Sequence, residues 1–146
     1  MKRLLIYIVG VVMLTTACEF HASDNGDLDG FWQLSSVDTL ATGGSTDLRY
    51  KQLSWSFQGQ LVELRDALDY MLAGDIIGRF QHEGDHLTLS DFYFSKRDSG
   101  DIKLVDPDSL RRYGVSHLQQ TFQVLQLNSS RMTLQSDSLR LNLRRY

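Results

Sequence analysis

The chain is 146 residues long, which allows one domain of ordinary size with a genuine hydrophobic core. It carries 15 basic and 18 acidic residues, a formal net charge of −3. This balance argues against nucleic acid or an anionic membrane surface as the main binding partner.

The N-terminus has the pattern of a targeting signal, which does not belong to the folded domain. Lys2 and Arg3 precede an apolar run over residues 4–14, shorter than the roughly 20 residues that a membrane-spanning helix needs. Ala17-Cys18 then resembles the cleavage point of a bacterial lipoprotein signal peptide. The resemblance implies a signal peptide over residues 1–17 and lipid attachment at Cys18, with palmitate among the expected acyl chains.

Cys18 is the only cysteine of the chain, and a lone thiol in an exported protein is otherwise unusual. The match departs from the usual motif at Thr15, where lipoproteins generally have leucine. The alternative is an ordinary secretory signal followed by a stray cysteine. The lipoprotein interpretation places the protein in the cell envelope, with the outer membrane as the expected location, on its periplasmic face or at the cell surface.

Cleavage ahead of Cys18 leaves 129 residues with 13 basic and 18 acidic side chains, a net charge of −5. Residues 18–28 are mostly small and polar, and we expect them to form a flexible lipidated tether. The folded domain is then expected to span residues 29–146.

The domain follows a two-residue period, in which apolar and polar side chains alternate as in a half-buried strand. The pattern predicts eight strands, at about 30–38, 51–58, 60–66, 75–82, 86–94, 118–127, 131–136 and 138–145. The alternation slips at Ser90-Asp91 and at Val124-Leu125, which predicts a bulge at each place.

Most links between the strands are short enough for hairpins. The long exception runs over residues 95–117, where the segment from Pro107 to Gly114 predicts a short helix. The fold class is therefore all-β, a single eight-stranded antiparallel up-and-down barrel with one short helix in a long loop. Closing such a sheet removes exposed edges, and a two-sheet sandwich is the alternative.

The start of the first strand resembles the Gly-x-Trp opening of the lipocalins, with Gly30, Phe31 and Trp32 in these positions. The resemblance implies that Trp32 plugs one end of the barrel under a basic residue of the last strand, for which Arg145 has the right alternation. The alternative for Trp32 is an ordinary core position. As a lipoprotein with this opening, the chain also resembles the small lipocalin-like lipoproteins of Bacteroides, whose function is uncharacterised.

Residues that would carry catalysis are few, and we expect no enzyme, no metal site and no cofactor. His82 and His86 flank a predicted turn and could approach each other, but a polar turn between two strands accounts for them equally. The chain contains neither a His-Glu-x-x-His helix motif nor a nucleophile elbow.

Two binding functions remain. An eight-stranded barrel is just wide enough to be filled by side chains or to hold one small apolar ligand. By alternation the lining of such a cavity is Trp55, Phe57, Phe80, Phe122 and Met132. The other function is an envelope module with a filled barrel that binds a protein partner through its loops. The 95–117 loop is apolar enough to be either a lid on the barrel or a partner surface.

Overall fold

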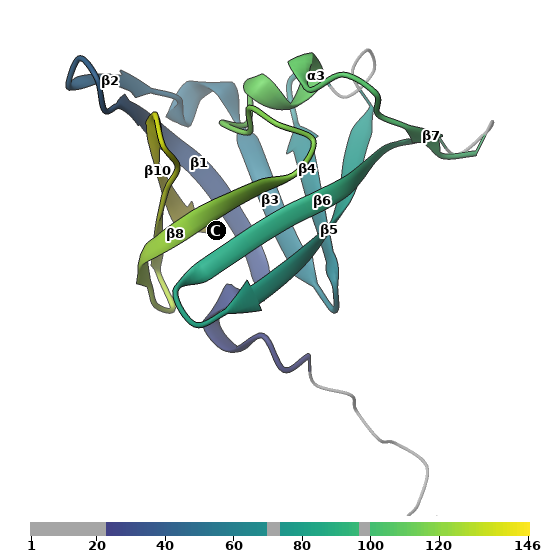
Figure 1. Ribbon diagram of the computed structural model, residues 1–146, viewed down its shortest axis with the longest axis horizontal. Helices are drawn as coiled ribbons and strands as arrows, with labels where there is room; N and C mark the ends of the chain where they lie inside the picture. Colours follow the sequence, from purple (N-terminus) through teal and green to yellow (C-terminus); the bar gives the residue numbers. More distant parts are fainter. Residues whose placement is uncertain (1–22, 70–73, 97–99) are drawn as a thin grey trace, which may run out of the picture.

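The computed structural model describes residues 23–69, 74–96 and 100–146 (Figure 1). The predicted signal peptide, Cys18 and the tether as far as residue 22 lie outside this part of the chain. Within it, no helix is long and apolar enough to cross a membrane.

Eight antiparallel strands form a closed ring around one core. Each pairs with the next along the chain, and the last pairs with the first from Trp32 to Thr39. This confirms the predicted up-and-down barrel and excludes the two-sheet sandwich. The eight strands are β1 (Gly30–Thr39), β3 (Leu53–Gln58), β4 (Leu61–Asp66), β5 (Asp75–Glu83), β6 (His86–Ser95), β8 (Gln120–Leu127), β9 (Arg131–Gln135) and β10 (Leu139–Arg145).

Two short strands that the alternation did not predict extend the barrel at one end. β2 (Gly44–Asp47) pairs with the second half of β1, beyond the point where β3 leaves it. β7 (Ile102–Lys103) pairs in the same way with the end of β6, beyond its pairing with β8. Figure 1 shows both at the end of the barrel that carries the helix α3 (Asp108–Arg111), which we call the mouth.

Both predicted bulges are confirmed. The register of β5 against β6 shifts between Ile77 and Arg79, and that of β8 against β9 shifts between Val124 and Gln126. A further shift in β1, between Leu34 and Ser36, was not predicted. Bulges increase the local bend of a strand, and the strands of a closed barrel need such bends.

The opposite end of the barrel, which we call the closed end, is covered by the chain that leads into β1. The 3-10 helix η1 (Gly26–Leu28) lies there, and Leu28 is completely buried. Folded structure therefore begins before residue 29, and the predicted boundary between tether and domain lies too far along the chain. An apolar side chain at position 28 gains more by entering the core than by remaining in a solvated tether.

Candidate functional site

The closed end brings together the three residues predicted to lie there. Trp32 is completely buried, and its indole Nε1 donates a hydrogen bond of 2.9 Å to the carbonyl of Leu28. The guanidinium carbon of Arg145 lies 5.0 Å from the centroid of the Trp32 ring, within the range of a cation–π contact. Arg145 also donates to the carbonyl of Asp29.

Gly30 allows this close packing. Its φ of +113° lies in a region that other residues rarely adopt. A Cβ atom at this position would stand 3.0 Å from the guanidinium of Arg145. The polar groups of Trp32 and Arg145 thus have partners, and this end of the barrel is structural.

The five residues predicted to line a cavity all point into the barrel. Between 0 and 6% of their surface is exposed, and the ring of Trp55 packs against those of Phe57 and Phe122, with ring centroids 6.2 and 5.9 Å apart. A space that admits a water molecule would leave its lining partly exposed. The interior is therefore filled by its own side chains, Phe80 and Met132 included.

Two hydrogen-bond donors are buried in this interior without an acceptor. They are the indole Nε1 of Trp55 and the hydroxyl of Tyr113, which have no partner among the described residues. An unpaired buried donor costs about 1–3 kcal/mol, and such groups are rare in folded proteins. Trp55 and Tyr113 are therefore the least satisfied polar groups of the described core.

Residues 104–115 close the mouth, and we call them the lid. Leu104, Leu110, Tyr113 and Val115 of this segment are buried in the barrel. The observed helix α3 matches the one predicted, and Gly114 follows it with a φ of +82°. Four apolar residues of the long loop thus cover the barrel, whereas Ile102 and Val105 of the same loop are exposed.

Arg112 fastens the lid to the rim of the barrel. Its guanidinium makes ion pairs of 3.0 Å with Asp66 and 3.1 Å with Asp69. The Arg112 side chain is 43% exposed, and exposed ion pairs typically contribute less than about 1 kcal/mol. Burial raises the pKa of Tyr113, the next residue, well above its ordinary value. The lid thus has the uncharged phenol of Tyr113 buried on its inner side and the weak, exposed ion pairs of Arg112 on its outer side.

A pocket of about 590 Å³ lies where the lid meets the rim. Its lining is mainly apolar, from Leu48, Leu53 and Leu68, with charged groups at its border from Lys51 and from Arg112 with its two aspartate partners. Pockets of this volume accommodate small ligands. We call this the mouth pocket.

His82 and His86, which were considered as metal ligands, do not lie in one site. His86 pairs through Nδ1 with Asp85 at 2.7 Å on the turn between β5 and β6. His82 lies beside a different pocket, at the closed end. The described residues contain no group of three side chains suited to a metal ion.

Sequence reasoning did not find Arg112, Asp66 and Asp69 as a group, nor Tyr113 as a buried donor. Arg112 and Tyr113 lie within the segment 107–114 that was predicted to be helical, but the sequence did not show which of its side chains enter the barrel. The one available signal was the apolar content of the long loop, which favours a lid and identifies no particular residue.

A closed antiparallel barrel with a plugged end and a covered mouth defines a class of proteins that generally bind small molecules and are not enzymes. The model of the lipocalin-like domain family matches residues 12–146, and the chain belongs to this family.

Two solved structures share the fold. A lipocalin-like protein from Bacteroides uniformis is 20% identical, with a TM-score of 0.63 over 83% of this chain and 100% of its own. An uncharacterized protein from Bacteroides eggerthii is 15% identical, with a TM-score of 0.57 over 82% of this chain and 99% of its own. No curated protein matches the sequence.

Proposed function

We propose that the protein is a non-catalytic binding protein of the cell envelope, whose barrel takes a small apolar ligand through the mouth. The observation that carries this proposal is the pair of unpaired donors, Trp55 Nε1 and Tyr113 Oη, in an otherwise apolar interior. A ligand with a hydrogen-bond acceptor would remove the energetic cost of one or both.

The interior also restricts the charge that a ligand can carry. Among the described residues, the buried polar side chains are Gln33 and Gln120, and no lysine or arginine is buried. An ionised group inside would lack a partner of opposite charge, which is costly. We therefore expect a neutral ligand with a carbonyl, ether or ester oxygen.

Entry requires the lid to move because the interior is already filled. Outward displacement of Leu110 would leave its volume to the ligand, and the mouth pocket would be the first point of contact. Opposing this movement are the loss of buried apolar contacts and the exposed ion pairs of Arg112. A ligand that replaces the apolar contacts offsets most of that cost.

Native mass spectrometry of residues 19–146, purified from the bacterial host without detergent, tests this function. A discrete extra mass that is lost on denaturation supports the proposal and begins to identify the ligand. A bare protein mass, with no shift when neutral long-chain methyl esters are added, would overturn it.

A pair of arginine variants tests the route. Arg112→Ala removes the fastening of the lid, so we expect the same methyl ester to enter several times faster, as measured by stopped-flow quenching of tryptophan fluorescence. Arg111→Ala is the matched control, because within the described part of the chain Arg111 pairs with Asp108 of its own helix and not with the rim. Equal entry rates in both variants would contradict a mouth route.

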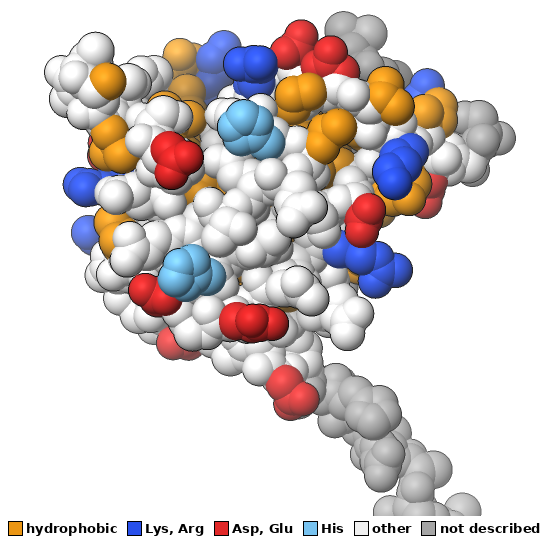
Figure 2. Space-filling model, viewed as in Figure 1, with side chains coloured by type: hydrophobic (Ala, Val, Ile, Leu, Met, Phe, Trp, Pro, Cys, Tyr) orange, Lys and Arg blue, Asp and Glu red, His pale blue; other side chains and the backbone are white. Residues whose placement is uncertain are grey.

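A second function is favoured by a different observation. Figure 2 shows hydrophobic side chains gathered at the end that carries α3 and β7, and Ile102 and Val105 are 49% and 88% exposed there. With a filled barrel, this surface would suit an envelope protein partner. Ile102→Asp and Val105→Asp would abolish capture of such a partner and leave the binding of methyl esters unchanged.

We also propose that Cys18 carries the lipid that tethers the domain to a membrane on the non-cytoplasmic side. This rests on the signal-like N-terminus and the single cysteine. Metabolic labelling with a palmitate analogue should mark the wild-type protein and leave Cys18→Ser unlabelled. Labelling of both proteins, or of neither, would contradict the tether.

A further inference from the structure

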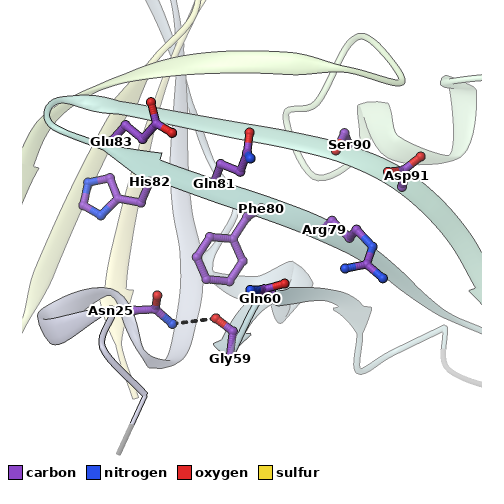
Figure 3. Close-up of a pocket in the computed structure, with 10 residues that line it drawn as sticks. All are labelled: Asn25, Gly59, Gln60, Arg79, Phe80, Gln81, His82, Glu83, Ser90 and Asp91. Carbon is purple, nitrogen blue, oxygen red and sulfur yellow. Dashed lines mark hydrogen bonds between the residues drawn. The ribbon is translucent and has the colours of Figure 1, made fainter.

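A second pocket, of about 440 Å³, lies at the closed end, outside the barrel interior. It is the notch between the end of β5 and the turn that joins β3 to β4, with Asn25 beneath it. Figure 3 shows Phe80 at its centre, Gln60 and the Asn25–Gly59 hydrogen bond below, and Arg79 and His82 at its two sides. We call it the β5-edge pocket.

The notch exists because β5 is longer than its neighbour. The pairing of β4 with β5 ends at Leu61 and Arg79, and one further hydrogen bond joins the amide of Phe80 to the carbonyl of Gln60. From residue 81 to residue 83, no described strand lies on that edge of β5. Backbone groups on a free strand edge are available to a ligand, and three residues are too few to hold a peptide as an added strand.

The side chains around the notch are polar and available. Across the described chain, the side chains of Gln60, Arg79, Gln81 and Glu83 make no hydrogen bond or ion pair. The amide nitrogen of Asn25 donates to Ser23 Oγ at 2.6 Å, to Asp29 Oδ1 at 2.8 Å and to the carbonyl of Gly59 at 2.8 Å, which leaves its amide oxygen as the acceptor for a ligand. The pocket thus offers the fixed amide oxygen of Asn25 and several unpaired polar side chains beside the end of β5.

The local charges are mixed. A ligand that is only anionic would meet the carboxylates of Glu83 and Asp91, and one that is only cationic would meet Arg79. Amide groups donate and accept, Arg79 only donates, and the carboxylates only accept. Hydroxyl groups also donate and accept, so an uncharged ligand with several hydroxyls can pair with all of them.

A strained residue borders the same pocket. Asp91 has a φ of +50°, unusual for a residue other than glycine, at the bulge in β6. Such strain costs on the order of 1–3 kcal/mol and often occurs where a side chain is placed for function. The Asp91 side chain lies at the border of the pocket, and its Oδ1 is 3.8 Å from Nζ of Lys103.

We propose that the β5-edge pocket binds a small uncharged polyhydroxylated ligand, a mono- or disaccharide. The site is separate from the barrel interior, so it does not depend on the binding of an apolar ligand there. Hydroxyl groups pair with the side chains of Gln60, Arg79 and Gln81 and with the free edge of β5.

Nuclear magnetic resonance of the mature chain tests the proposal with named probes. Glucose, galactose, N-acetylglucosamine and maltose are titrated, while the amide shifts of residues 59–60 and 81–83 are followed. We expect at least one sugar to bind with a millimolar dissociation constant and to shift these amides. No shift with any of the four sugars would overturn the proposal.

Matched variants distinguish the pocket from general surface effects. Arg79→Ala combined with Gln81→Ala should weaken sugar binding about tenfold or more, because two pairs of hydrogen bonds are lost. Arg131→Ala combined with Gln126→Ala is the control, since both residues are exposed strand positions outside the pocket. Equal weakening by the two double variants would contradict the assignment.

Charged probes test the class of ligand. Sulfate and glycine should leave the same amides unshifted at the concentrations at which a sugar binds. If sulfate or glycine shifted them and the sugars did not, the pocket would be an anion or zwitterion site and the proposal would be wrong. The binding of methyl esters in the barrel is measured separately, by native mass spectrometry.

Discussion

The two ends of the barrel are closed in different ways. At the closed end, the buried donor of Trp32 has its acceptor, and Arg145 packs over the ring while bonding to backbone carbonyls. At the mouth, the hydroxyl of Tyr113 is buried without a partner, and Arg112 fastens the lid through exposed ion pairs. The difference predicts that the mouth opens more readily than the closed end.

Hydrogen exchange should show the largest difference between the two ends. The amides of Tyr113 and Val115 bond to the carbonyl of Leu110 within the lid, at 2.9 and 3.3 Å. We expect them to exchange by local opening at least a hundredfold faster than the amides of β1 at Trp32 and Leu34, which lie within the paired barrel. Equal protection at both ends would show that the lid opens only on global unfolding.

One pair of substitutions compares the two buried donors directly. Trp32→Phe removes a satisfied donor and leaves the carbonyl of Leu28 without its partner, so we expect it to lower the free energy of unfolding by about 2–3 kcal/mol. Tyr113→Phe removes an unsatisfied donor of the same shape, so we expect no change or a gain of up to about 1 kcal/mol. Urea denaturation measures both, and a large loss in Tyr113→Phe would reveal an acceptor for its hydroxyl.

The barrel was predictable because each of its eight main strands alternates buried and more exposed side chains over at least part of its length. An alternation such as that from Leu53 to Gln58 records which side chains enter the core, and its slips record the bulges. The alternation did not predict the short strands β2 and β7. Gly44–Asp47 is entirely exposed and polar, and Ile102–Lys103 is too short to show a period.

The positions of functional residues could be predicted from the sequence only where these residues lie on paired strands. Alternation places Arg145 on the core side of β10, and the pairing of β1 with β10 sets it opposite Trp32. The lid contacts depend instead on how a loop returns to the barrel: Arg112 meets Asp66, which lies 46 residues away in the sequence. No local pattern records such a meeting, nor the notch left where β4 ends beside β5.

The two arginines give a further comparison of the ends. Arg145→Ala removes a cation–π contact and bonds to backbone carbonyls in a partly buried place, so we expect a loss of about 1–2 kcal/mol. Arg112→Ala removes exposed ion pairs, and we expect a loss below about 1 kcal/mol. Thermal and urea unfolding would measure both; a greater cost for Arg112→Ala would reverse the assignment of the stable end.

The smallest expected effect is a dependence of stability on alkaline pH. Burial raises the pKa of Tyr113 above the value of 10.0 that an exposed tyrosine has. The folded protein therefore holds the phenol proton more tightly than the unfolded chain. The stability linked to this proton is fully present below pH 10, and we expect about 1 kcal/mol of it to be lost between pH 10 and pH 11.

Urea unfolding at pH 9, 10 and 11 measures this loss, with two variants as references. Tyr113→Phe has no phenol to ionise in the lid, so its stability should fall less than that of the wild type over this range. Tyr50→Phe, at a site that is 66% exposed, should fall as the wild type does. If Tyr113→Phe followed the wild type instead, the phenol would already be accessible in the folded state, and the mouth would be open without any ligand.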